Sequence, residues 1–346
     1  MKKSRIKFVS KNTVFAFQFL SLPQAHADEI EWVLDPEARD YDWLVVYDDL
    51  PSRADERLSL GVETLSCPQE NTVLLTYEPS SVKFYGQDYM DQFGMVLTSH
   101  EPEALRHRNR RDMPPIGVWF YGGLEQANAH PKAPEKTGLV SMFGSPKAQK
   151  HTLHHRRAEF LVELANGLGE QVDVYGKGYQ FVEHKAEGID AYRYHIAVEN
   201  HIGAHHWTEK LSDAFLGYSL PFYVGCSNLE AYFPEESFIR LDILDKAAAL
   251  ATIERAIVDK AYEKRLPAIV EARRRVLEDY NLGNLVAKHI LQAPKVKVPK
   301  APGKILSRHA MQRRDLPTFL RYAVGKTSAR RRGRKHYGSY LEGKIS

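Results

Sequence analysis

A lysine close to the predicted start of a helix is the most informative chemical feature of the sequence. Thr208 precedes apolar residues with helical spacing, so it is the expected N-cap, and Lys210 then lies in the first turn. A cation there is unfavourable by roughly 0.3–1 kcal/mol, because amide N–H groups and the helix dipole already present positive charge. A bound phosphate would compensate for this, whereas a plain surface lysine would be solvated or would pair with Glu209 or Asp213. From these residues alone, both interpretations stay open.

The elements around Lys210 form a strand, a loop, a helix and a second strand. Residues 194–198 alternate as in a strand, residues 200–207 form the loop, and residues 208–218 have helical spacing. The apolar run at 220–224 is the second strand. The loop follows the carboxyl end of the first strand, which is where open α/β sheets bind their ligands.

Three runs in this region, AVEN, WTEKLSDAFLGYSLPFYVG and NLEAYFPEESFI, resemble the donor-binding signature of glycosyltransferase family 10, the α-1,3/α-1,4-fucosyltransferases. Their order agrees with the signature, as does the spacing from the Asn of AVEN to the Glu-Lys pair. The resemblance covers residues 137–245 well and suggests a bacterial-type member. Val198 stands where the family has Phe, His201 where it has Ser, and His206 at a position that is usually aromatic. These departures lie beside the sugar and concern the identity of the donor.

The resemblance implies an α/β fold of the GT-B architecture, with two Rossmann-like domains facing across a cleft and with C-terminal helices. It also implies inverting, metal-independent transfer of a sugar from a nucleotide-sugar donor. We expect fucose from GDP-fucose as the donor and a hydroxyl of a glycan, such as lipopolysaccharide or surface polysaccharide, as the acceptor. Two alternatives stay open: a different nucleotide sugar, or a non-catalytic protein that binds carbohydrate or nucleic acid.

Two cations are expected to neutralise the departing diphosphate. The bond from the sugar to the diphosphate breaks through an oxocarbenium-like transition state, and the leaving group gains negative charge. Lys210 would act as a point charge, and Arg157 would bind phosphate oxygens in a bidentate manner. Arg157, on a helix predicted over 154–168, fits the position of an arginine in the family, and Arg156 is the alternative. No Asp-x-Asp motif lies in a suitable loop, the nearest approximation being residues 40–42, so we expect no metal and no other cofactor.

The remaining roles concern the sugar and the acceptor hydroxyl. Asn200 is expected to bond ribose, phosphate or sugar oxygens, and Glu209 to accept from sugar hydroxyls or lie near the developing positive charge. His206 and Trp207 are expected to pack on the sugar or on the base. Glu78, which follows a predicted strand, is the closest match to the family's general base for the acceptor hydroxyl.

Other residues offer alternatives for these roles. Glu78 could instead be a plain surface carboxylate, and then Asp48, Asp49 and Glu101, which also follow predicted strands, are the candidate bases. The paired histidines at 154–155 and 205–206 do not indicate a metal site, because adjacent side chains in a helix or strand point in different directions.

The composition predicts two domains and a basic tail. The 346 residues are enough for an acceptor domain over 1–130 and a donor domain with trailing helices over 137–290, joined by a linker at 122–137. The tail, 293–346, is strongly basic: from residue 291 on, 15 Lys and Arg face two acids, a local charge of +13 against +4 for the whole chain.

The tail suggests contact with an anionic membrane surface, although a disordered segment without a partner stays open and nucleic acid is the less favoured partner. We therefore expect a cytoplasmic protein on the inner face of the membrane. The two cysteines, Cys67 and Cys226, indicate neither a disulfide framework nor a zinc site. Lys2 to Ala27 resembles a secretory leader, but a first strand at residues 6–9 is the preferred interpretation. No apolar run is long enough to cross a bilayer.

Overall fold

The computed structural model describes residues 2–11, 19–20, 25–53, 56–115, 119–144, 153–294, 296 and 303–341. The chain forms two compact units, one made of Met1–Pro115 and Asn281–Lys335, the other of Ile116–Tyr280 and His336–Ser346. Each contains a parallel sheet with helices, as the α/β prediction requires. The boundaries differ from those predicted at 130 and 137, and most of the tail is part of the first unit. The cleft between two domains stays a prediction.

The first unit is built on a six-stranded parallel sheet with the order β2-β1-β3-β5-β6-β7. Its strands are β1 (Ser4–Ser10), β2 (Ile30–Val33), β3 (Trp43–Tyr47), β5 (Thr72–Leu75), β6 (Met95–Thr98) and β7 (Arg110–Asp112). β1 lies inside the sheet, between β2 and β3, and its apolar side chains are buried. The interpretation of the N-terminal residues as a first strand is therefore confirmed.

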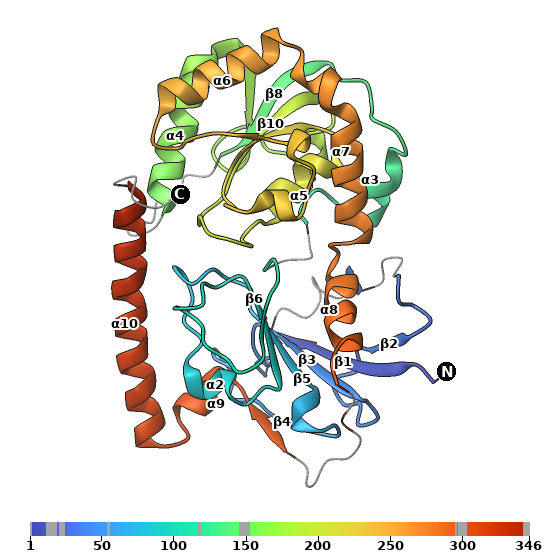
Figure 1. Cartoon of the computed structure of the whole chain (residues 1–346), viewed down its shortest axis with the longest axis vertical. Helices are drawn as coiled ribbons and strands as arrows, with labels where there is room; N and C mark the ends of the chain where they lie inside the picture. Colours follow the sequence, from blue (N-terminus) through green and yellow to red (C-terminus); the bar gives the residue numbers. More distant parts are fainter. Residues whose placement is uncertain are drawn as a thin grey trace. The chain divides into compact units, whose positions relative to one another are not determined.

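The C-terminal part of the chain completes this unit. Strand β13 (Lys304–Leu306) pairs antiparallel with β4 (Val62–Thr64), far from it in sequence. The helices are α2 (Gln87–Met90), α8 (Leu282–Leu291), α9 (Arg308–Gln312) and α10 (Leu316–Leu341) (Figure 1). Only the last six residues of α10 lie outside the unit. The tail therefore forms regular elements from Lys304 on, and the alternative of a disordered tail is wrong for them. No helix in the described part of the chain is long and apolar enough to cross a membrane.

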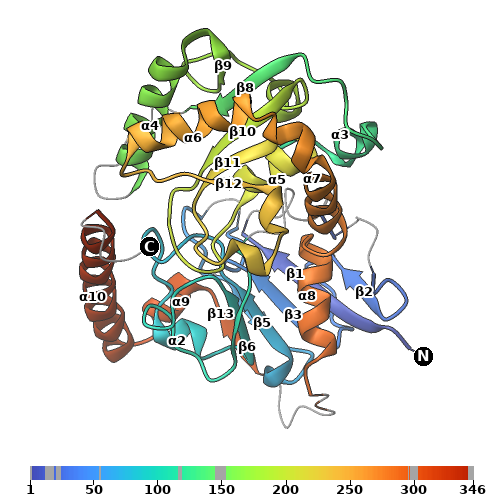
Figure 2. The same ribbon diagram turned by 45° about the horizontal axis from the view of Figure 1, so that its top comes forward.

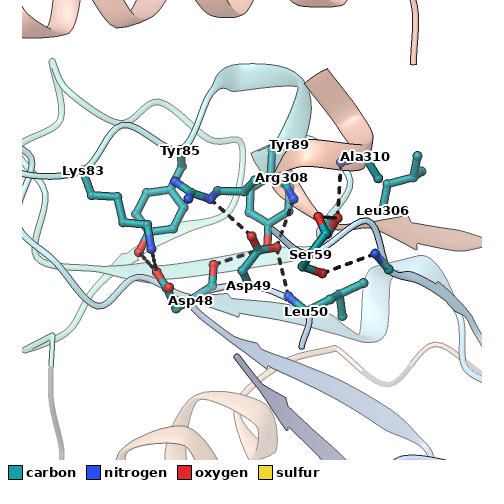
Figure 3. A network of polar contacts seen from close by, with 12 residues as sticks. Asp48, Asp49, Leu50, Ser59, Lys83, Tyr85, Tyr89, Leu306, Arg308 and Ala310 are labelled. Carbon is teal, nitrogen blue, oxygen red and sulfur yellow. Dashed lines mark hydrogen bonds and ion pairs between the residues drawn. The ribbon is translucent and has the colours of Figure 1, made fainter. Parts of the chain in front are cut away.

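A buried carboxylate attaches the C-terminal segment to this unit (Figure 3). Asp49 is 1 % exposed and accepts a hydrogen bond from the backbone N–H of Arg308 at 3.0 Å, beside the guanidinium of the same residue. Burial raises the pKa of Asp49, and Arg308 opposes that shift. The neighbouring Asp48 accepts from the hydroxyl of Tyr85 at 2.7 Å and pairs with Lys83. Both carboxylates thus have structural partners, which argues against them as alternative general bases.

The second unit is built on a five-stranded parallel sheet with the order β12-β11-β10-β8-β9. Its strands are β8 (Gly138–Phe143), β9 (Val172–Tyr175), β10 (Tyr192–Val198), β11 (Leu220–Val224) and β12 (Ile239–Arg240). The chain passes from β8 to β9 in one direction across the sheet and from β10 to β11 in the other. Right-handed crossovers then place the connecting helices on opposite faces. The carboxyl ends of β8 and β10 form the switch point at which such sheets bind ligands.

Two helix pairs accompany this sheet (Figures 1 and 2). Helix α6 (Lys246–Val258) packs on α4 (Leu153–Leu168), and α7 (Ala261–Glu278) packs on α5 (Glu209–Leu216). The predicted linker contains a short helix, α3 (Leu124–Ala129), so it is not the unstructured segment expected.

The core of the second unit contains a histidine that makes stability depend on pH. His195 in β10 is 4 % exposed, and its Nδ1 lies 2.8 Å from the Ser141 hydroxyl. Burial, with minor contributions from Lys185 and Lys136, lowers its pKa from 6.5 to about 3. Between these values the unfolded chain binds a proton that the folded protein does not. His195 therefore favours folding fully above about pH 6.5, and this contribution falls as the pH decreases toward 3.

We expect the free energy of unfolding to decrease on acidification below pH 6.5, by at most about 1.4 kcal/mol per pH unit from this group. His195→Asn should flatten that dependence, because the amide does not titrate. Urea unfolding at several pH values between 4 and 8 measures the free energy of unfolding and its slope with pH. His155→Asn, on the half-exposed side of α4, is the matched control and should leave the slope unchanged. An equal slope in His195→Asn and the unmodified protein would contradict the assignment.

Candidate functional site

The candidate site is the loop that joins β10 to α5, at the switch point of the second sheet. The side chain of Thr208 accepts a hydrogen bond from the backbone N–H of Lys210 at 3.4 Å, and α5 begins at Glu209. The predicted N-cap and the position of Lys210 in the first turn are therefore confirmed. The loop itself starts at Glu199, directly after the last residue of β10.

A buried carboxylate closes this loop. Glu199 is fully buried; its Oε1 accepts from the backbone N–H of Thr208 at 2.8 Å and its Oε2 from the Thr208 hydroxyl at 2.7 Å. A Cβ atom at Gly225 would overlap the Cγ atom of Glu199, so only glycine fits at that end of β11. Glu199 belongs to the AVEN run, but the sequence alone gave it no role of its own. A carboxylate at the end of an apolar strand, nine residues before a helix cap, was the available signal.

The ammonium group of Lys210 lies among acceptors. Its Nζ is 2.8 Å from Oε1 of Glu209, 3.1 Å from the Thr208 hydroxyl and 3.4 Å from Oε2 of Glu199. The pairing with Glu209 was the plain interpretation of this lysine, and it is present. The other suggested partner, Asp213, pairs with Lys185 instead, at 2.7 Å. Lys210 therefore balances two carboxylates rather than one.

Burial and mutual attraction shift the titration of all three groups. Burial raises the pKa of Glu199, and the nearby Lys210 opposes that shift. Burial alone would also raise the pKa of Glu209, but Lys210, together with Lys185, lowers it to about 2. Burial disfavours the charged form of Lys210, yet the two carboxylates outweigh it and raise the lysine's pKa. At neutral pH the site thus holds a buried ammonium beside an ionised Glu209.

Arg157 in α4 reaches the same site from the other side of the switch point. Its Nε donates to the carbonyl oxygen of Val198 at 2.8 Å and its Nη2 to that of Phe143 at 3.3 Å, the last residues of β10 and β8. Burial lowers its pKa, and Glu199 and Glu209 oppose that shift. Among the residues that the structure describes, Nη1 makes no hydrogen bond, so this end of the guanidinium can bind a ligand.

The two cations chosen from the sequence are thus brought together. Arg157 is bonded to the carbonyl group of Val198, the residue before Glu199, and Nζ of Lys210 lies 3.4 Å from Oε2 of Glu199. The charge of Arg157 disfavours the charged form of Lys210. The alternative arginine, Arg156, points elsewhere: it lies 4.0 Å from Glu159 on the same helix. The geometry favours Arg157 over Arg156.

Asn200 adds an acceptor to the site. Its Oδ1 is buried and has no hydrogen-bond partner among the described residues. An unsatisfied buried acceptor costs free energy, and a hydroxyl or amide group of a ligand would remove that cost. This observation agrees with the role predicted for Asn200.

The two aromatic positions after the loop differ in their surroundings. Trp207 is 1 % exposed and packs edge-on against Tyr232, Phe233 and Tyr280, so it is a core residue and not a surface for a sugar or base. His206 is 3 % exposed, with its ring 5.0 Å from that of His201. Its proposed contact with the donor stays a prediction.

The predicted general base lies in the first unit. Glu78 follows β5 and is half-buried, and its backbone carbonyl accepts from Nε2 of His100 at 2.8 Å. The alternative base Glu101 accepts from the Ser80 hydroxyl at 2.6 Å. Both carboxylates therefore lie near the carboxyl ends of neighbouring strands, and the choice of Glu78 stays a prediction.

Comparison with known proteins identifies the segment that carries the site. The sequence profile "Glycosyltransferase family 10 (fucosyltransferase) C-term" matches residues 133–264. This range includes β8 to α6 and every candidate residue of the second unit. The resemblance inferred from the three sequence runs is confirmed for this segment.

Similar proteins include 4-galactosyl-N-acetylglucosaminide 3-alpha-L-fucosyltransferase 9 of Mus musculus and of Homo sapiens. Each is 31 % identical over 102 residues, a match that spans 28 % of this chain and 28 % of the relative. Among solved structures, an alpha1,3-fucosyltransferase with GDP-fucose aligns over 85 % of this chain and 93 % of its own, at 17 % identity and a TM-score of 0.49. A glycosyltransferase from Rickettsia africae ESF-5 aligns over 85 % and 100 %, at 9 % identity and a TM-score of 0.49.

Proposed function

We propose that the protein is a glycosyltransferase, from the premise that residues 133–264 match the C-terminal model of glycosyltransferase family 10. The proposed reaction moves fucose from GDP-fucose to a hydroxyl group of a glycan such as lipopolysaccharide or surface polysaccharide, with inversion and without a metal ion. The observation that carries this proposal is the convergence of Arg157 and Lys210 on one buried site at the ends of β8 and β10.

The proposed chemistry is a single displacement. The acceptor oxygen attacks the anomeric carbon, the bond from that carbon to the diphosphate oxygen breaks, and Glu78 takes the proton of the acceptor hydroxyl. The electron pair of the broken bond stays on GDP. Arg157 and Lys210 stabilise the negative charge that develops there, the task that a divalent ion performs in other transferases.

An exchange of hydrogen-bond partners allows Lys210 to act both in the free protein and in the protein with a bound donor. Without a donor, its ammonium is bound to Thr208, Glu209 and Glu199. We propose that the diphosphate replaces Glu209 in this set. Glu209 is then released to accept hydrogen bonds from the sugar hydroxyls, while Asn200 Oδ1 receives a bond from the donor. Diphosphate binding and sugar binding are coupled in this way.

Nucleotide binding tests the proposal directly. In buffer with EDTA, we expect GDP and GDP-fucose to raise the melting temperature of the protein, and UDP to have little effect. Consumption of GDP-fucose in the presence of glycan acceptors measures turnover. A preference for UDP or another nucleotide sugar selects the different donor. Turnover that disappears with EDTA contradicts the metal-free mechanism, and RNA binding without any nucleotide response selects the non-catalytic alternative.

We also propose that α10 binds an anionic membrane surface on the cytoplasmic side. Four apolar residues of this helix are exposed on one side, at 69, 51, 53 and 70 %: Leu316, Phe319, Leu320 and Val324. The opposite side packs on the first unit, where the ring of Tyr322 lies 5.5 Å from that of Phe84. An exposed basic run follows at 330–335. An apolar stripe next to clustered cations is the pattern that binds at the headgroup level.

Replacing the four apolar residues with serine is expected to weaken binding to vesicles containing phosphatidylserine at least tenfold, because each buried CH₂ contributes about 0.8 kcal/mol. Cosedimentation measures the affinity, and neutral vesicles or high salt should also reduce it, since each basic residue contributes about 1 kcal/mol. Val258→Ser, an equally exposed apolar residue of the second unit, is the control. Unchanged vesicle binding in the fourfold variant would contradict the proposal, and binding of RNA instead would identify the partner as nucleic acid.

A further inference from the structure

The last turn of α10 contacts the candidate site through residues that neither the signature nor the proposed mechanism uses. Residues 336–340 belong to the second unit and are partly buried, whereas most residues of the basic run at 330–335 are exposed. We propose that this turn forms a wall of the donor site and that His336 positions the loop carrying Asn200. The inference rests on the proposed function.

The first contact is made with the site loop itself. The imidazole of His336 is stacked on that of His201, with ring centroids 5.7 Å apart and an interplanar angle of 18°. Its Nε2 lies 3.2 Å from the carbonyl oxygen of Ile202, a geometry in which the ring N–H donates. His201 in turn meets His206 edge-on at 5.0 Å. A continuous row of three rings thus links the tail to both ends of the loop.

The loop needs such support because its own backbone is strained. His205 has a φ of 63°, in the left-handed region that residues with a Cβ atom rarely adopt. Its backbone N–H is held by Oδ1 of Asn228 at 2.7 Å, and its Nδ1 lies 2.6 Å from the Tyr232 hydroxyl. These contacts fix the second half of the loop. The stack on His201 is the corresponding contact for the first half, next to Asn200.

The second contact of the turn covers the carboxyl ends of the neighbouring strands. Tyr340 lines a pocket together with Ile202, Gly225 after β11, and Asp242 after β12. Burial, reinforced by the charge of Asp242, raises the pKa of Tyr340 to about 12. The tyrosine therefore stays a neutral hydrogen-bonding group at physiological pH.

The helix that carries Arg157 acts on the turn through its charges. Burial raises the pKa of Tyr337, and Arg156 and Glu159 of α4 are the charges that act on it. The turn thus contacts the loop after β10 directly, and the charges of α4 act on it as well. A group placed there restricts the site without touching the reacting atoms. Its loss should weaken donor binding and leave the chemical step nearly intact.

Substitution of His336 in the full-length protein tests this role. We expect His336→Ala to raise the KM for GDP-fucose and the Kd for GDP about threefold to tenfold, the range for loss of one ring-stacking contact, with kcat within twofold. His336→Phe keeps the ring on His201 and should restore most of the affinity. Thr327→Ala, on the exposed part of the same helix, is the control and should change neither constant. All measurements are made in EDTA, so that no metal ion bridges the imidazoles.

The outcomes separate this inference from the proposed function. Strong GDP binding by the unmodified protein with the same Kd in His336→Ala overturns the wall proposal and leaves the proposed function standing. A weaker Kd that His336→Phe does not restore, accompanied by a lower melting temperature, shows general destabilisation and also overturns it. Absence of any GDP binding by the unmodified protein overturns both.

Discussion

Replacing Lys210 with alanine is expected to lower kcat/KM for GDP-fucose by about 10²–10³-fold, the usual cost of removing one group that stabilises developing negative charge. The ammonium is nearly enclosed, with 18 % of the side chain exposed, and no other lysine contacts Glu199 in the described part of the chain. Loss of the charge removes a diphosphate ligand and leaves two carboxylates that repel the same anion. The GDP Kd should rise together with KM.

Two further variants test whether the loss of activity in Lys210→Ala comes from the missing charge at the donor site. Lys246→Ala removes a cation of the same unit that is paired with Glu163 on another surface, and it should change kcat/KM less than twofold. Glu209→Gln should bind GDP more tightly than the unmodified protein, because Lys210 loses the partner that competes with phosphate, and should transfer sugar more slowly. If Lys210→Ala lowers the melting temperature without weakening GDP binding, the lysine is structural and the proposed exchange is wrong.

Replacing Glu78 with glutamine is expected to reduce kcat about 10²–10⁴-fold, the range for loss of a general base, while KM for the donor changes less than twofold. Glutamine keeps the size and the hydrogen-bonding capacity of the side chain but cannot accept the acceptor's proton. Steady-state kinetics at saturating acceptor measures both constants. Thermal unfolding with GDP should remain unchanged, because Glu78 lies in the first unit and the proposed nucleotide-binding residues lie in the second.

Glu101→Gln is the matched control for this prediction. Glu101 also follows a strand of the first sheet and accepts from Ser80, so its replacement tests the same environment. A large loss of kcat in Glu101→Gln with a small loss in Glu78→Gln would transfer the assignment to Glu101. Equal, small losses in both would remove the catalytic role from this region.

The sequence predicts the second unit well because its signals are local. The limits of β11 agree with the strand expected at 220–224, the strand expected at 194–198 lies within β10, and α5 begins directly after the expected cap at Thr208. Short apolar runs and N-cap residues act over a few positions, so they can be read from one sequence. The pairing of Lys210 with Glu209 also follows from adjacency.

Features that depend on distant residues were missed. The antiparallel pairing of β13 with β4 joins segments about 240 positions apart and has no local signal. The role of Glu199 requires knowing that α5 folds back onto the end of β10, and the burial of Trp207 depends on Tyr280 at the end of α7. The helix α3 was missed because its composition resembles that of a linker.

The attachment of Arg308 to Asp49 has a consequence for biosynthesis. During synthesis on the ribosome, residues 1–115 are made long before β13 and Arg308. Until Arg308 is available, Asp49 lacks the cation that compensates for the burial of its carboxylate. The sheet that is synthesised first is therefore the one whose folding is completed late, after nearly all of the other unit has left the exit tunnel. Nascent chains from which residue 304 has not yet left the exit tunnel should expose the first unit to proteases, and chains from which residues up to 312 have left the tunnel should protect it.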